Sequence, residues 1–218
     1  MKILRYLLFC FFCLNLTNTF SQKKISDFSI MYDYEISNGK TPSSKPIIGV
    51  NSIYVKGNMS RSETGSQSFS SVIIHDGTTG SGVILKEVSG QKILIHLTPQ
   101  NWRQMNSDDE AITFTNTDET KTIAGYKCIK AIGKTQDGSI FSVYYTNELS
   151  VDNAEYNPKF KNLAGLPLEY ELSKGSFTIK YMVSKINLNP VPASKFDTPK
   201  SGYREMTYEE SKKLSVGG

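Results

Sequence analysis

The sequence predicts a mainly β protein built on a single, strongly curved antiparallel sheet, with short helices or loops on its concave face. Three observations support this prediction. Segments in which apolar and polar residues alternate recur along the chain, and a period of two is typical of half-buried strands. Short turns rich in Gly, Ser and Asp separate most of these segments. About nine or ten such strands are expected, and a sheet with that many strands must curl or split.

The first 21 residues are expected to be a cleaved signal peptide. Lys2 and Arg5 precede a continuous apolar run at 6–16, which is the charge and hydropathy pattern of a secretory leader. Thr19 and Ser21 place small residues at positions −3 and −1 of a cleavage site after Ser21. The apolar run is too short to persist as a membrane-spanning helix. The chain is therefore predicted to be exported and periplasmic.

Residues 22–218 are expected to form a single domain. Removal of the leader leaves Cys128 as the one cysteine, so no intramolecular disulfide can form. Bulky residues precede Cys13, which argues against lipidation of that cysteine. Loss of Lys2 and Arg5 lowers the formal net charge from +4 to +2. A nearly neutral domain lacks the basic footprint of a nucleic-acid partner.

The expected strands are short and follow one another along the chain. They cover residues 28–36, 52–63, 69–75, 83–88, 92–98, 112–117, 166–172 and 177–185. The alternation is clearest at 28–36, where every second residue is apolar. This pattern predicts an antiparallel strand with one buried and one solvated face.

Residues 122–146 are expected to form a central hairpin. Two runs rich in β-branched and aromatic residues flank Asp137-Gly138. An Asp-Gly pair favours a type I′ turn, which needs positive φ at both central positions. In the second run Phe141, Val143 and Tyr145 share one face.

Two short helices are expected, at residues 100–105 and 207–214. Thr98 would cap the first, Pro99 would occupy its first helical position, and the acidic stretch at 107–110 would end it. Thr207 and Glu210 form a capping box at the start of the second. Between them lies the longest irregular stretch, 147–164, and loops of that length are usually functional or mobile.

Several motifs of the chain match a known pattern. They are TIAGYKC at 122–128, Asp137-Gly138, VYYT at 143–146, LAGLPLEY at 163–170, FDTP at 196–199 and GYREMT at 202–207. In these motifs the chain resembles the DUF4412 and GLPGLI-type exported proteins of Bacteroidetes, although it lacks the second glycine after Pro167. Those proteins are similar to the LolA/LolB-like lipoprotein-carrier superfamily. The resemblance implies a LolA-like half-barrel in the cell envelope, and it implies no activity because none is established for the family.

Two interpretations of the inward-facing strand residues remain open. The candidate residues are Tyr32, Tyr34, Phe141, Val143, Leu168, Tyr170, Ile179 and Tyr181. They could line an apolar cavity for a lipid or a lipoprotein acyl chain, with tyrosine hydroxyls meeting its polar end. They could also form an ordinary core, since any half-buried strand alternates in this way. The protein would then be a structural or interaction module of the envelope, with a partner site on loop 147–164.

The sequence does not support an enzyme. His75 and His96 lack the paired spacing of metal ligands, and His75 is expected to face solvent at the end of a strand. Cys128 is expected to be a packed thiol, because free cysteine is among the most buried residue types. The chain contains neither a G-x-S-x-G motif nor a phosphate-binding loop. The prediction is therefore a non-enzymatic protein without metal or cofactor, whose partner is a lipid, an acyl chain or another envelope protein.

Overall fold

The structure is a computed structural model that describes residues 22–39, 45–66, 70–88 and 90–216. The expected signal peptide and its cleavage after Ser21 lie outside these residues. The described chain is mainly β, as predicted. Within it, no helix is both long enough and apolar enough to cross a membrane.

The strands in chain order are β1 (Lys23–Ile25), β2 (Asp27–Asn38), β3 (Ile47–Lys56), β4 (Met59–Ser66), β5 (Ser70–Asp76), β6 (Ser81–Val88), β7 (Gln91–Leu97), β8 (Thr113–Ile123), β9 (Tyr126–Lys134), β10 (Ile140–Thr146), β11 (Leu149–Val151), β12 (Leu166–Lys174), β13 (Phe177–Asn187) and β14 (Arg204–Thr207). The α-helices are α2 (Pro99–Glu110) and α3 (Tyr208–Val216). The 3-10 helices are η1 (Ala154–Tyr156), η2 (Pro158–Phe160) and η3 (Ala193–Phe196).

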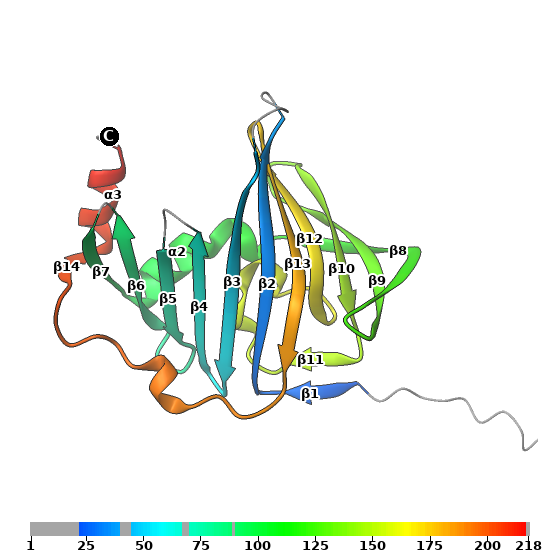
Figure 1. The fold of residues 1–218 in the computed structure, drawn as a ribbon, viewed down its shortest axis with the longest axis horizontal. Coiled ribbons are helices and arrows are strands. Elements are labelled where there is room, and N and C mark those ends of the chain that lie inside the picture. Colours follow the sequence, from blue (N-terminus) through cyan, green and yellow to red (C-terminus); the bar gives the residue numbers. More distant parts are fainter. Residues whose placement is uncertain (1–21, 40–44, 67–69, 89, 217–218) are drawn as a thin grey trace, which may run out of the picture.

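Twelve strands form one sheet in the order β14-β7-β6-β5-β4-β3-β2-β13-β12-β10-β9-β8. All neighbours pair antiparallel except β14 and β7, which are parallel. A separate parallel pair joins β1 to β11. The sheet curves around α2 and the segment that follows β11, which lie behind it in Figure 1. We call the covered side the concave face.

The alternation expected at 28–36 is present in β2. Phe28, Ile30, Tyr32 and Tyr34 are buried, and the residues between them are half-buried or exposed. β2 pairs with β3 on one side and with β13 on the other. It therefore places its apolar set near the middle of the concave face.

The predicted hairpin turn has a different geometry from the one expected. Only Gly138 has positive φ at the Asp137-Gly138 corner, where Thr135 N donates to Ser139 O, so the type I′ prediction was wrong. The preceding turn between β8 and β9 does have two positive φ values, 50° at Ala124 and 85° at Gly125. The Thr135–Ser139 backbone pair encloses a three-residue loop, and loops of this length combine a type I turn with a single left-handed residue, which explains the difference.

Helix α2 begins as predicted and ends later than predicted. Thr98 caps it, and its hydroxyl accepts from Asn101 N at 3.2 Å. The helix continues through the acidic residues to Glu110, so the expected break at 107–110 was wrong. Asp109 is held by an ion pair with Lys159, which offsets the poor helix propensity of the acidic end. Helix α3 has the expected Thr207–Glu210 capping box, and it packs at the β7–β14 end of the sheet.

In the part of the chain that the structure describes, apolar side chains pack in three clusters. The largest lies on the concave face of the half built from β2, β13, β12, β10 and β9. A second lies beneath α2, around Trp102, Ile84 and Leu97. The third lies on the opposite face, where Val191 and Phe196 cover Ile74.

Candidate functional site

The eight candidate residues share the concave face. Four of them form one cross-strand row over β2, β13, β12 and β10, in the order Tyr34, Tyr181, Tyr170 and Val143. Tyr32 and Leu168 are fully buried, while Phe141 and Ile179 are half-buried. The alternation thus identified one continuous face of the sheet. Its role in lining a ligand cavity stays a prediction.

This face is covered by the chain itself. We call residues 154–163, which contain η1 and η2, the plug. Its Phe160 packs against Tyr170 with 4.8 Å between ring centroids, and against Phe141 at 6.4 Å. Its Tyr156 meets Phe28 edge-on at 6.0 Å. The apolar layer expected to line an open cavity is therefore filled in this structure.

Polar contacts fasten the plug to α2 and to the chain just after it. Lys159 pairs with Asp109 on α2. Lys161 lies 3.4 Å from Glu110, and within the plug it lies 2.7 Å from Glu155. The Asn162 amide donates to the carbonyl oxygens of Glu110 and Ile112, at 2.9 Å each. Ion pairs at the surface contribute little individually, so the plug is held mainly by its buried aromatic side chains.

A pocket of about 200 Å³ remains between α2, the plug and the sheet. We call it the α2 pocket. It is lined by Asn51, Ile53, Ser60, Ser62, Ile73, Trp102, Met105, Asn106, Asp109, Tyr156, Asn157, Pro158, Lys159, Tyr170 and Tyr181. Pockets for drug-sized molecules usually measure about 300–1,000 Å³. The α2 pocket suits a smaller group.

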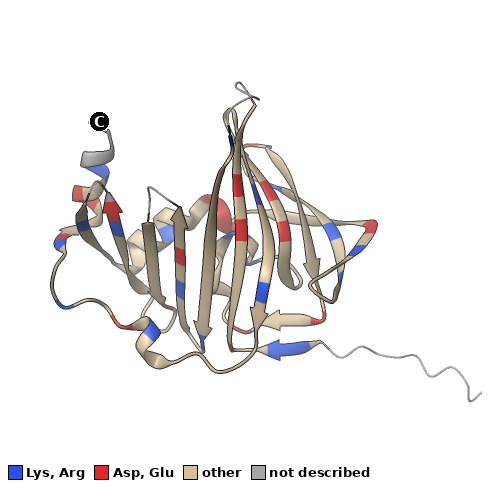
Figure 2. Ribbon diagram, viewed as in Figure 1, with Lys and Arg blue, Asp and Glu red and all other residues tan. Residues whose placement is uncertain are grey.

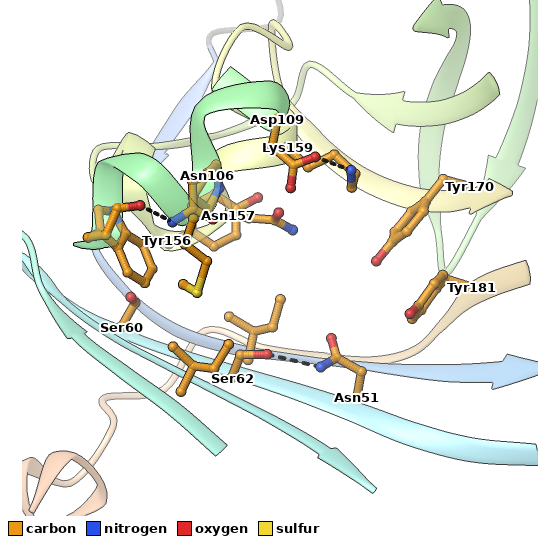
Figure 3. A pocket seen from close by; sticks show the side chains of 15 residues that line it. Asn51, Ser60, Ser62, Asn106, Asp109, Tyr156, Asn157, Lys159, Tyr170 and Tyr181 are labelled. Atoms are coloured by element: carbon orange, nitrogen blue, oxygen red, sulfur yellow. Dashed lines mark hydrogen bonds and ion pairs between the residues drawn. The ribbon is translucent and has the colours of Figure 1, made fainter. Parts of the chain in front are cut away.

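Polar atoms point into the α2 pocket from the sheet (Figure 3). The hydroxyls of Tyr170 and Tyr181 face its interior, as does the amide oxygen of Asn51. The Asn51 nitrogen is occupied elsewhere, donating to Ser62 Oγ at 3.0 Å and to Thr64 Oγ1 at 2.8 Å. Ser60 is only 5% exposed, and its hydroxyl makes no hydrogen bond to any residue that the structure describes.

The two tyrosines that the sheet contributes to the pocket, Tyr170 and Tyr181, are neutral donors at physiological pH. Burial raises the pKa of Tyr170 well above its usual value, and neighbouring Tyr181 adds to the shift. Burial likewise raises the pKa of Tyr181, with Tyr34 as the second cause. By contrast, Tyr32 and Tyr34 are satisfied internally, because they donate to the carbonyls of Pro167 and Gly65. Only part of the predicted tyrosine set therefore offers hydroxyls to a ligand.

His75 lies beneath α2 and does not face solvent as expected. It is 1% exposed, and its ring stacks on Trp102 with centroids 3.7 Å apart. Neither ring nitrogen makes a hydrogen bond of good geometry to a described residue. Burial lowers the pKa of His75, against the opposing influence of Glu155, the nearby Gly80 backbone and Asp76. The sequence prediction failed here because α2, distant in the chain, covers the end of β5.

Glu155 connects the stacked pair to the plug. Trp102 Nε1 donates to Glu155 Oε2 at 3.2 Å, and Lys161 Nζ donates to Glu155 Oε1 at 2.7 Å. Burial opposes ionisation of Glu155, yet these hydrogen bonds hold its pKa below the usual value. The carboxylate therefore stays charged and ties the start of the plug to α2.

The remaining groups with reactive chemistry are separated from one another. Cys128 on β9 is fully buried, and burial raises the pKa of its thiol to about 11. Six strands of the sheet lie between β9 and β5, which carries His75. His96 is exposed and lies 3.0 Å from Glu205. Among the described residues, no group of three or more His, Cys, Asp or Glu side chains could hold a metal ion.

Sequence reasoning missed the polar groups of the α2 pocket and the plug. Asn51 lies on the same face of β3 as Ile53 and Val55. A polar residue on the otherwise apolar face of a strand could have indicated a polar site. Phe160 and Tyr156 lie in an irregular segment without periodicity, so no pattern could assign them to a face.

No protein family model matches the chain. No curated protein matches it either. The DUF4412 and GLPGLI-type resemblance therefore stays a prediction.

The fold is similar to several solved structures at low identity. PNGF-II matches with a TM-score of 0.49 and 13% identity over 86% of this chain and 33% of its own, so this chain spans about a third of that protein. A LolA superfamily protein from Nitrosomonas europaea matches with a TM-score of 0.41 and 12% identity over 81% of this chain and 92% of its own. MucB in complex with MucA(peri) matches with a TM-score of 0.36 and 12% identity over 79% of this chain and 55% of its own.

Proposed function

We propose that this chain is a non-enzymatic binding protein of the cell envelope, exported by its leader and free of lipidation. Its ligand is a lipid or the acyl chain of a lipoprotein, held against the concave face. One observation carries the proposal: the aromatic layer around Tyr170 is covered by two single-turn 3-10 helices instead of a long helix. A cover of this kind can be displaced without unfolding the sheet.

The energies of the plug and of an acyl chain are comparable. The plug buries Tyr156, Phe160 and Leu163, and burial of such side chains contributes about 1.5–3 kcal/mol each. Displacing all three would cost about 5–9 kcal/mol. An acyl chain of about ten methylenes gains about 8 kcal/mol on burial, at about 0.8 kcal/mol each. Exchange of the plug for a chain is therefore close to balanced, as a carrier that must also release its ligand requires.

The charge distribution fits a ligand that is not a polyanion. Basic and acidic side chains are interspersed along the strands and loops in Figure 2, and the formal net charge of the full chain is only +4. Binding of nucleic acid depends on clustered Lys and Arg. Apolar burial is thus the better-supported source of affinity.

A second candidate function is a structural or interaction module with a permanently filled core. The close packing of Val143 and Leu168, both fully buried, favours it. The partner site would then be the outer surface of 147–164, where Lys161 and Asn162 are exposed. In that case deletion of the loop 147–164 would abolish binding of the partner protein, and no small-molecule ligand would be needed for that binding.

Lipid extraction and mass spectrometry of residues 22–218, purified without detergent, distinguish the two. A stoichiometric lipid supports the binding protein. A lipid-free protein that also fails to take up a fluorescent fatty acid contradicts it and favours the interaction module. The same measurements on Phe160→Ala serve as a control. They show whether the wild-type protein fails to bind only because the plug is not displaced by the lipid.

A further inference from the structure

The α2 pocket is a built polar site whose inward-facing atoms lack partners within the protein. Asn51 and Ser60 are 7% and 5% exposed, and Tyr170 is 6% exposed. The Asn51 oxygen and the hydroxyls of Ser60, Tyr170 and Tyr181 border the pocket and make no hydrogen bond to any described residue. Each of these atoms borders the open space of the pocket, so a ligand or ordered water there would supply its hydrogen-bond partner.

All four of these groups are neutral. Three are hydroxyls, which both donate and accept, and the fourth is an amide oxygen, which accepts. The charged residues at the pocket rim, Asp109 and Lys159, are paired with each other. An ionic group placed among these side chains would have to compete with the Asp109–Lys159 pair for an opposite charge, which is unfavourable. The pocket therefore favours a neutral group over carboxylate, phosphate and ammonium groups.

The pocket adjoins the volume that the plug occupies. Tyr156 belongs to the plug and also lines the pocket. Tyr170 packs against Phe160 at 4.8 Å, and its hydroxyl faces the pocket. A ligand whose chain replaced Phe160 would place its polar end near Asn51 and Tyr181. The volume of about 200 Å³ accommodates an end group of limited size.

We infer that the α2 pocket binds a neutral, hydroxyl-rich head group, such as a single sugar ring, at the end of the hydrophobic ligand. This inference rests on the proposed function, because it names the polar end of the same ligand. A sugar offers several hydroxyls that can pair with the Asn51 oxygen and with the hydroxyls of Tyr170 and Tyr181, which lie at the same end of the pocket in Figure 3. Each such pair replaces a hydrogen bond to water and satisfies a group that is unpaired within the protein.

Calorimetric titration with compounds that share one chain and differ in head group tests the inference. The probes are octyl glucoside, octanoate and octylammonium, each below its micellar concentration, with methyl glucoside as the probe without a chain. We expect octyl glucoside to bind at least tenfold more tightly than octanoate or octylammonium. Tyr170→Phe and Tyr181→Phe should each weaken octyl glucoside about threefold to tenfold, the range expected for one hydrogen bond. Neither change should alter octanoate binding.

Matched controls lie on the opposite face of the sheet. Ser52→Ala removes a buried hydroxyl one residue from Asn51, and Tyr54→Phe removes a tyrosine hydroxyl beneath Lys195. Both should leave all affinities unchanged.

The outcomes separate the inference from the proposed function. Equal affinity for the three octyl compounds, unaffected by Tyr170→Phe and Tyr181→Phe, overturns the neutral head-group site and leaves the binding protein standing. Octyl glucoside binding no more tightly than methyl glucoside contradicts the proposed function and leaves the head-group site standing. Failure of all four compounds to bind overturns both.

Discussion

The imidazole ring of His75 stacks flat on the indole of Trp102, with 3.7 Å between the ring centroids and 8° between the ring planes. This stacked pair connects the end of β5 to α2. The indole nitrogen of Trp102 also donates a hydrogen bond to Glu155 at the start of the plug. The unpartnered histidine nitrogens thus lie beneath the element that frames the α2 pocket. Protonation of the His75 ring would therefore disturb the stacking contact that holds α2 against the sheet.

Acidification should weaken the fold through His75. Burial lowers the pKa of His75 in the folded protein, so the unfolded chain binds the proton more readily, and stability falls as pH drops below about 6.5. We expect the melting temperature to fall less between pH 8 and pH 5 in His75→Phe, which keeps an aromatic ring against Trp102, than in the wild-type protein. Thermal melts across this range measure the difference.

The exposed histidine provides the control for that experiment. His96→Phe changes an imidazole that lies at the surface beside Glu205. Its pH profile should follow the wild-type profile. Identical profiles for wild type and His75→Phe would show that His75 does not carry the coupling.

Shortening the central plug side chain should lower stability and raise ligand uptake. Phe160→Ala removes contacts to Phe114, Phe141 and Tyr170. Truncation of a buried phenylalanine costs about 3–5 kcal/mol, and the vacated volume adjoins the α2 pocket. We expect a lower melting temperature together with tighter binding of a fluorescent fatty acid. Phe196→Ala, on the opposite face, should lower the melting temperature without changing affinity.

Filling the pocket should abolish binding while the fold persists. Tyr181 is half-buried and borders the α2 pocket, so Tyr181→Trp places a larger ring against the pocket at a position that is not fully buried. Val143→Trp is the less informative change, because Val143 is fully buried and overpacking a tight core is destabilising. Circular dichroism should show a folded Tyr181→Trp protein that no longer takes up the fatty acid. Undiminished uptake by this variant would place the ligand elsewhere.

Gly165 fixes the position at which the plug ends and β12 begins. A Cβ at this position would lie 2.0 Å from the carbonyl oxygen of Thr146, and backbone atoms of paired strands cannot give way cheaply. We expect Gly165→Ala to destabilise the protein by about 2 kcal/mol or more, measured by urea denaturation. Gly39→Ala, whose Cβ would meet its nearest atom at 3.6 Å, should be nearly neutral. Equal urea denaturation midpoints for Gly165→Ala and Gly39→Ala would contradict the close approach of Gly165 to the Thr146 carbonyl.

The sequence predicted those parts of the fold that depend on local pattern. Period-two alternation places Tyr32 and Tyr34 on one face whatever the tertiary structure, and the Thr98 cap with Pro99 determines the start of α2. The burial of Phe160 could not be predicted, because its partners come from β8, β10 and β12 and no local sequence pattern encodes these contacts. The burial of His75 was missed for the same reason. Asn51 was detectable in principle as a polar residue in an apolar phase.

Quenching of Trp102 by a brominated fatty acid tests the central claim most directly. Trp102 is the single tryptophan of the chain, and it lines the α2 pocket. Bromine quenches only indoles that it nearly touches, so a ligand in the proposed position must reduce the emission. We predict saturable quenching at one ligand per protein, and stronger quenching in Phe160→Ala. Quenching should be lost when the pocket is filled, as in Ile73→Trp, after the emission of the added tryptophan is subtracted. Emission that stays constant in both the wild-type protein and Phe160→Ala would contradict it.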